Sequence, residues 1–200
     1  MPAYVVHGGM LLLSLVPNAF ACPREVPAPW DADVRADAPR LLVVFKRAFE
    51  LGLYEAGRLV DGQCYPIAMG ATPEGPKTRM DRSSTLEGWY RVAERRDEGQ
   101  TAYHRAFLVD YPNGDDADRA LAAGVIDGST HARLRASSEA GRLPSQTTAM
   151  GGWILIHGMG STPRDWTWGC VGVDNPTIDA LFPRVQTGDP ILFVPWAPSH

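Results

Sequence analysis

Glycine and proline interrupt this chain at short intervals, with 20 glycines and 17 prolines among 200 residues. Proline breaks the interior of a helix, and glycine favours turns over regular structure. Such frequent breaks favour many brief strands joined by turns, and they exclude a bundle of long helices.

Short apolar runs between these breaks predict the elements of a mainly β fold. We expect strands over 41–45, 51–54, 58–60, 65–70, 88–92, 103–110, 153–156 and 190–194, and short helices over 115–123, 126–141 and 176–185. Strands at this spacing, without regular alternation with helices, favour a β-sandwich or irregular barrel with a few short helices. Residues 22–40 hold four prolines among alternating charges, so we expect a Pro-rich tether there, followed by one folded domain over 41–200.

The first residues are typical of an export signal. The apolar run Met10–Val16 is followed by Ala19-Phe20-Ala21, a small-x-small cleavage pattern, although no Lys or Arg precedes the run. A signal peptide over 1–21 would leave Cys22 at the start of an exported protein of the periplasm or cell envelope. Alternatively, Cys22 carries a lipid anchor. The apolar run is too short to span a bilayer.

The charge and the cysteines exclude further classes. The chain has 19 basic and 23 acidic residues, a net charge of −4, and no basic run that would follow a phosphate backbone, so we expect no nucleic-acid partner. Three cysteines, Cys22, Cys64 and Cys170, are too few for a disulfide scaffold. A Cys22–Cys64 bridge with Cys170 free is one arrangement, and three unpaired buried thiols are another.

The segment from Ile154 to Asn175 pairs a histidine with a cysteine across one glycine-rich loop. A buried strand ends at His157, and the chain reaches Cys170 after 12 intervening residues. A neighbouring imidazole can turn a thiol, whose pKa is ordinarily near 8.5, into a nucleophile. Gly169 precedes Cys170, so the backbone amides of Gly169 and Cys170 are candidates for an oxyanion hole. A structural histidine beside a tight buried corner is the alternative interpretation.

These residues resemble the YkuD-type L,D-transpeptidase catalytic domain, whose signature is His-Gly, a loop, and Ser/Thr-x-Gly-Cys. Thr167-Trp168-Gly169-Cys170 matches the end of that signature. The upstream residues Gly70, Lys77, Asp81, Thr85, Glu87-Gly88 and Tyr90 are similar to a second family motif, and Tyr111-Pro112-Asn113 resembles an exported bacterial branch. Trp168 stands where histidine is frequent, and Gly172 stands where many members carry arginine.

The resemblance implies an enzyme of peptidoglycan synthesis, with a part in cell-wall biogenesis and cell shape, and the fold of that catalytic domain. It implies that Cys170 attacks a stem peptide to form a thioester, that His157 acts as base and acid, and that the Gly158 carbonyl orients the imidazole. Asp165 is a weaker candidate for that last role. Thr167, Trp168 and Tyr111 are the predicted substrate contacts.

Other functions remain open at this stage. Water in place of an amine acceptor would give an L,D-carboxypeptidase or amidase, and a non-catalytic cell-wall-binding module is a further alternative. A zinc site would use His104, His157, Cys64 and Cys170, and a glycosidase would use Glu74 and Glu87, but neither set has the expected spacing. We expect no metal or cofactor. Trp166 and Trp168 are candidates for a sugar-peptide groove, whereas Trp89 and Trp153 are expected in the core.

Overall fold

The computed structural model describes residues 22–72, 74–80, 83–160 and 165–195. Ten strands are described: β1 (Leu41–Phe45), β2 (Glu50–Glu55), β3 (Arg58–Pro66), β4 (Met69–Gly70), β5 (Gly88–Arg96), β6 (Ala106–Val109), β7 (Leu155–His157), β8 (Asp165–Thr167), β9 (Val171–Gly172) and β10 (Pro190–Val194). The described α-helices are α1 (Gly114–Ala122), α2 (Gly128–Glu139) and α3 (Asn175–Leu181), and the 3₁₀ turns are η1 (Trp30–Ala32), η2 (Val34–Asp37) and η3 (Lys46–Ala48). The signal peptide expected over 1–21 lies outside the described residues.

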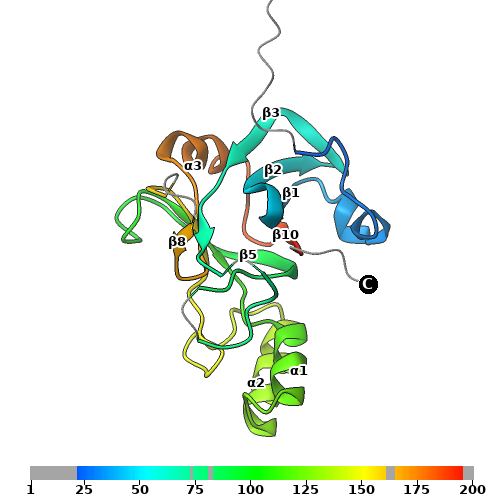
Figure 1. Ribbon diagram of the computed structural model, residues 1–200, viewed down its shortest axis with the longest axis vertical. Helices are drawn as coiled ribbons and strands as arrows, with labels where there is room; N and C mark the ends of the chain where they lie inside the picture. The colour runs from blue at the N-terminus through cyan, green and yellow to red at the C-terminus, as the bar shows by residue number, and fades with distance from the viewer. Residues whose placement is uncertain (1–21, 73, 81–82, 161–164, 196–200) are drawn as a thin grey trace, which may run out of the picture.

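Eight strands form one curled sheet in the order β3-β2-β1-β10-β5-β6-β7-β9, and β4 pairs with β8 in a separate ladder. After β3, at one edge of the sheet, the chain crosses to β9, at the other edge. There Ala68 and Gly172 exchange backbone hydrogen bonds of 2.8 and 2.9 Å. The mainly β prediction is therefore confirmed, in its irregular-barrel form. Figure 1 shows α1 and α2 side by side at one end of the molecule, away from β1, β2 and β3.

Both faces of the central strands are buried, which explains the continuous apolar run of β1. Leu42 and Val44 enter the main core, together with α3 and the inner faces of the other strands. Leu41, Val43 and Phe45 enter a second cluster on the opposite face. Because successive side chains of a strand point to opposite faces, a strand covered on both sides is apolar at every position.

Residues 22–40 form the cover of that second cluster, so the prediction of a Pro-rich tether is wrong. Val26 and Ala36 are buried against the sheet, and the side chain of Asp33 caps η2 by accepting from the Arg35 amide. The few apolar residues of this segment follow no helical or strand period, so their burial is visible only once the sheet provides a face for them.

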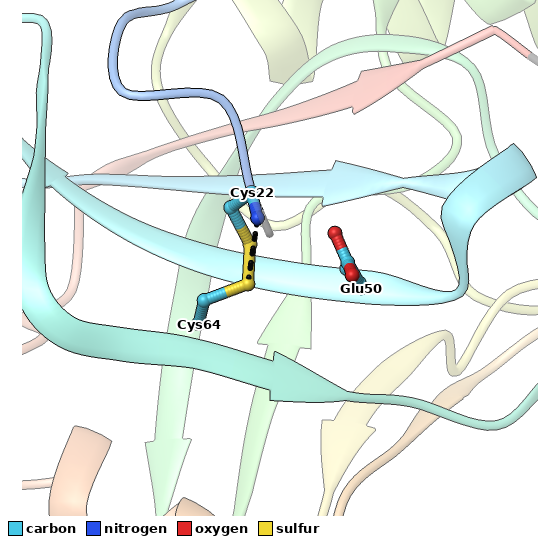
Figure 2. A group of neighbouring side chains, drawn as sticks. All are labelled: Cys22, Glu50 and Cys64. Atoms are coloured by element: carbon cyan, nitrogen blue, oxygen red, sulfur yellow. Dashed lines mark hydrogen bonds between the residues drawn. A yellow bond between two sulfur atoms is a disulfide. The ribbon is translucent and has the colours of Figure 1, made fainter. Parts of the chain in front are cut away.

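Cys22 anchors this segment through a disulfide to Cys64 on β3, and Cys170 is free. Figure 2 shows the disulfide beside the carboxylate of Glu50. A sulfur in a disulfide cannot also carry a thioether-linked lipid, so the lipid anchor predicted as an alternative at Cys22 would require a form of the protein without this bridge. Among the helices that the structure describes, none combines the length and apolar character needed to cross a bilayer.

Removing the disulfide in the Cys22→Ser/Cys64→Ser double variant is expected to lower the free energy of unfolding by about 2–4 kcal/mol, because the bridge restricts the unfolded chain. Urea denaturation measures this change. Reductant should shift the midpoint of the wild-type protein toward that of the variant and leave the variant unaffected. A wild-type midpoint that is insensitive to reductant would contradict the prediction.

The sequence placed most elements within a few residues. Helices expected over 115–123, 126–141 and 176–185 correspond to α1, α2 and α3. The strand expected over 103–110 is shorter, because residues 101–105 form bends before β6. The two short strands β8 and β9 were not predicted. Two or three residues carry too little periodicity to be recognised, and these strands exist only through their partners β4 and β7.

Candidate active site

His157 ends β7, which lies between β6 and β9 in the sheet. Its side chain is 1% exposed, and its Nδ1 lies 2.7 Å from the carbonyl oxygen of Gly158. A carbonyl can only accept a hydrogen bond, so Nδ1 carries the proton and donates it. In the neutral ring, Nε2 is then unprotonated and available as a base.

Gly158 allows α3 to approach the end of β7. A Cβ atom at this position would lie 2.8 Å from the Asn175 side-chain oxygen and 3.0 Å from Ile178. The Asn175 oxygen also accepts from the Met159 amide at 2.9 Å. The His-Gly pair of the sequence is therefore explained locally: the glycine admits the helix, and its carbonyl holds the imidazole.

Cys170 immediately precedes β9, and the strand register relates its position to that of His157 on β7. Ile156 pairs with Val171 and His157 with Gly172 in parallel register, so Cys170 lies level with Leu155. The Leu155 amide donates to Cys170 Sγ at 3.4 Å, and the thiol lies 3.7 Å from the Trp153 carbonyl oxygen. Alternate residues of a strand share a face. Cys170 therefore belongs to the same face as Leu155 and His157.

The turn that presents Cys170 depends on Gly169 and Thr167. Gly169 has a φ of +112°, which side-chain-bearing residues rarely adopt, and a Cβ there would lie 2.7 Å from the Ser84 carbonyl oxygen. Its amide donates to Thr167 Oγ1 at 3.2 Å, and Thr167 Oγ1 donates to the Cys170 carbonyl at 2.7 Å. In this state the Gly169 amide is therefore used within the turn, in contrast to its predicted oxyanion role.

The same bonds change the interpretation of Thr167. Its side chain is buried, and its hydroxyl both accepts and donates within the turn. The substrate contact predicted for Thr167 does not fit this arrangement, and the residue shapes the backbone around Cys170 instead.

The segment between β4 and β5 packs against this turn, and Lys46 holds the segment in place. The Lys46 Nζ is fully buried and donates to the carbonyls of Gly75 and Thr85 at 2.9 and 3.2 Å, and it pairs with Glu87 at 2.7 Å. The Thr85 hydroxyl accepts from the Gly70 amide at 3.1 Å. Lys46 thus fixes the loop on which the nucleophile turn rests.

Burial determines the charge state of the two candidate catalytic groups. It raises the pKa of the Cys170 thiol above its ordinary value, and the Leu155 amide and the charge of Lys77 oppose this rise. Burial also lowers the pKa of His157, opposed by the bond to Gly158. Both shifts favour the neutral forms, so the resting pair at neutral pH is a thiol and an uncharged imidazole.

Two neighbours of this pair were not predicted as site residues. Tyr103 stacks on the His157 ring, with centroids 3.6 Å apart, and Lys77 is buried beside Gly169 and Cys170. Lys77 lies in the upstream motif that the sequence analysis noted, so its spacing was a usable signal. Tyr103 lies in a bend without any motif, and only the tertiary structure identifies it.

The burial of the tryptophans and of Tyr111 differs from the prediction. Tyr111 is fully buried and its hydroxyl donates to the Met150 carbonyl, so its assignment as a substrate contact is wrong. Trp153 is 51% exposed, so its assignment to the core is also wrong, whereas Trp89 is buried as expected. Trp168 is 82% exposed, and Trp166 lies edge-on to His157 with centroids 6.3 Å apart. Trp168 thus remains available as a substrate contact.

The zinc site and the glycosidase pair considered from the sequence do not assemble in the structure. Cys64 is on β3, at the opposite end of the strand order from β7 and β9, and its sulfur is in a disulfide, so the predicted zinc set does not assemble. Within the described residues, a metal-type cluster of Cys22, Glu50 and Cys64 is found, with both of its sulfurs used by that bridge. Glu87 is paired with Lys46 and Glu74 is exposed, so they form no glycosidase pair. The side chain of Asp165 lies outside what the structure describes.

Gly172 stands where many members of the resembling family carry arginine, and the structure gives a reason for the glycine. A Cβ at Gly172 would lie 2.7 Å from the Gly160 carbonyl oxygen, because the two backbones cross there. Gly160 also donates to the Val173 carbonyl at 2.9 Å. The close crossing leaves no room for a side chain.

Comparison with known proteins gives the same fold. Residues 39–192 match the family described as YkuD, L,D-transpeptidase catalytic domain. Among curated proteins, none matches this sequence. The helical cell shape determining protein Pgp2 from Campylobacter jejuni has a TM-score of 0.52 and 19% identity, covering 80% of this chain and 49% of that one. Bd1075 from Bdellovibrio bacteriovorus has a TM-score of 0.51 and 23% identity, covering 82% and 50%.

An L,D-transpeptidase from Xylanimonas cellulosilytica has a TM-score of 0.48 and 17% identity, covering 78% of this chain and 61% of that one. The chain thus spans about half to three-fifths of the length of these solved structures. The two likenesses with TM-scores above 0.5 concern the fold, and the family match covers most of the described domain.

Proposed function

This chain belongs to the L,D-transpeptidase catalytic domain family, and we propose that it is a cysteine-dependent transpeptidase of peptidoglycan stem peptides. The observation that carries the proposal is the placement of Cys170 on the face of His157, with the imidazole held by the Gly158 carbonyl so that Nε2 is free to take a proton.

In the proposed acylation, the Cys170 S–H turns from the Trp153 carbonyl toward Nε2 of His157 and gives up its proton. The sulfur attacks the carbonyl carbon at the L-centre of a diaminopimelate-like residue. The tetrahedral intermediate then collapses, the bond to the terminal D-alanine breaks, and the imidazolium gives the proton to the leaving amine. The products are a thioester on Cys170 and free D-alanine.

The second step resolves the thioester. An amine of a neighbouring stem peptide gives up a proton to Nε2 and attacks the thioester carbonyl, which forms the new peptide bond and restores the thiol. Water in the place of the amine would complete a carboxypeptidase reaction from the same intermediate. The exposed Trp168 and the half-exposed Trp166 support substrate binding next to the pair.

We also propose that the protein is exported, as the first 21 residues predict. The Cys22–Cys64 disulfide supports this location, because such bridges persist in oxidising compartments and are rare in the cytosol.

The proposal is tested with purified protein and disaccharide-tetrapeptide, followed by mass spectrometry. We expect release of D-alanine, a transient thioester on Cys170, and incorporation of an added D-amino acid. Continued D-alanine release without incorporation would identify a hydrolase. Binding of the muropeptide without D-alanine release or an adduct would overturn the enzymatic proposal in favour of a wall-binding module.

A further inference from the structure

Tyr103 covers one face of the candidate base. Its ring and that of His157 are nearly parallel, at an interplanar angle of 17° and a centroid separation of 3.6 Å. The tyrosine comes from the bend before β6, and β6 is the hydrogen-bonded neighbour of β7. Sheet pairing of Ala106 with His157 brings the bend and the imidazole together.

Tyr103 is also a neighbour of the thiol. Tyr103 and Cys170 both pack against the small cluster of Ala106, Leu108 and Leu155 on this face of the sheet. Burial raises the pKa of Tyr103, and a negative charge on Cys170 raises it further, so the phenol lies within electrostatic reach of the sulfur. One side chain therefore contacts the base and lies close to the nucleophile.

The reactive state of this pair is a thiolate beside an imidazolium, and burial opposes both charges. A cation in a desolvated site gains from the negative face of an aromatic ring placed within about 6 Å of it. The Tyr103 ring is well inside this distance and presents its face to the imidazole. It is therefore placed to favour the charged ring over the neutral one.

We propose that Tyr103 is a positioning residue, whose ring holds the imidazole of His157 in its plane and stabilises the imidazolium that forms when the thiol gives up its proton. This inference rests on the proposed function only in taking His157 as the base and Cys170 as the nucleophile. It assigns to Tyr103 a part in the ionisation step itself, before any substrate is bound.

The other charged groups near His157 and Cys170 either act on the thiol or pair with one another. Lys77 acts on Cys170 and favours the thiolate. Next to Gly158, His104 and Arg105 both contact Asp179 of α3, at 2.9 and 2.7 Å, and His104 also pairs with Glu98 at 3.4 Å. These groups are paired with one another, and their charges are the same in the variants compared below.

The test is the rate of Cys170 alkylation by iodoacetamide as a function of pH, in native protein whose other two cysteines are held in the disulfide. In Tyr103→Leu we expect the rate near neutral pH to fall by roughly three- to thirty-fold, from the lost interaction between ring and cation. At high pH, where the thiol ionises without the imidazole, the rate should match that of the wild type. Tyr103→Phe keeps the ring and should restore the profile.

Two further variants separate ionisation from packing. Tyr65→Leu is the matched control and should leave the profile unchanged, because this half-buried tyrosine of β3 donates to Gln63, and Arg184 and Asp174 are the charged groups that act on it. In a His157→Ala background, Tyr103→Leu should have no further effect, because there is no imidazolium to stabilise. An equal loss of rate at every pH, an unshifted profile, or an effect that persists without His157 would overturn the inference.

Alkylation needs no muropeptide, so the two proposals fail independently. A shifted profile in a protein that releases no D-alanine would keep the inference and remove the transpeptidase assignment. Release of D-alanine with an unshifted profile would do the reverse.

Discussion

Cys170→Ala is expected to abolish D-alanine release from disaccharide-tetrapeptide, by at least about a thousandfold in kcat, because it removes the proposed nucleophile and the other two cysteines of the chain are joined in the disulfide. Cys170→Ser should lose nearly as much, since a hydroxyl ionises far less readily than a thiol. Neither change removes a core side chain, because Cys170 is partly exposed. The thermal midpoint should therefore stay within a few degrees of the wild type.

The matched control is the Cys22→Ser/Cys64→Ser double variant, which removes the other two sulfurs at the far edge of the sheet. It should keep D-alanine release at temperatures where it remains folded. Intact-mass spectrometry should find the thioester adduct in wild type and control, and in neither Cys170 variant. D-alanine release by folded Cys170→Ala at the wild-type rate would contradict the nucleophile assignment.

Lys46→Met is expected to lower the free energy of unfolding by about 3–5 kcal/mol, because it leaves Glu87 mostly buried without its cation and removes the donor to two loop carbonyls. Since the loop rests on the turn before Cys170, D-alanine release should fall as well. Urea denaturation, followed by fluorescence and circular dichroism, measures the stability change.

Two comparisons sharpen this result. The Lys46→Met/Glu87→Met double variant should recover part of the loss, because it also removes the carboxylate that the Lys46 ammonium neutralised. Arg58→Met removes a pair with Glu25 whose side chains are 71% and 70% exposed, and it should cost less than about 1 kcal/mol. A loss in Lys46→Met no larger than that in Arg58→Met would mean that the buried pair does not hold the loop.

Residues 22–40, which cover the second cluster, show where the fold prediction from sequence was wrong. Cys22, Val26 and Ala36 are spaced like neither a helix nor a strand, and the prolines favour an extended chain. Their burial follows from the second face of the sheet, which is built by β1, β2, β5 and β10 from positions up to 170 residues away. A segment of this kind gains its structure from the surface it covers.

The site residues show the same difference between local sequence features and tertiary contacts. His157, Gly169 and Cys170 were predicted from their own sequence, since a strand end, a glycine-rich return and a thiol are all local features, and the role of Gly158 was predicted from the resemblance to the family. Tyr111 was predicted as a substrate contact because Tyr111-Pro112-Asn113 resembles a branch of the family, whereas its ring enters the core. Tyr103 was missed because only the pairing of β6 with β7 brings it to His157.

The sequence by itself determined the fold class, the three helices, most strands and the candidate pair of nucleophile and base, because apolar periodicity, turn residues and a short loop are local properties of the chain. Tertiary structure alone decided which sulfurs are joined, which aromatic rings are exposed, and which buried charges hold the loop beneath Cys170. These depend on contacts between strands distant in sequence, where the free energy of burial and of charge pairing is set by neighbours that no local pattern identifies.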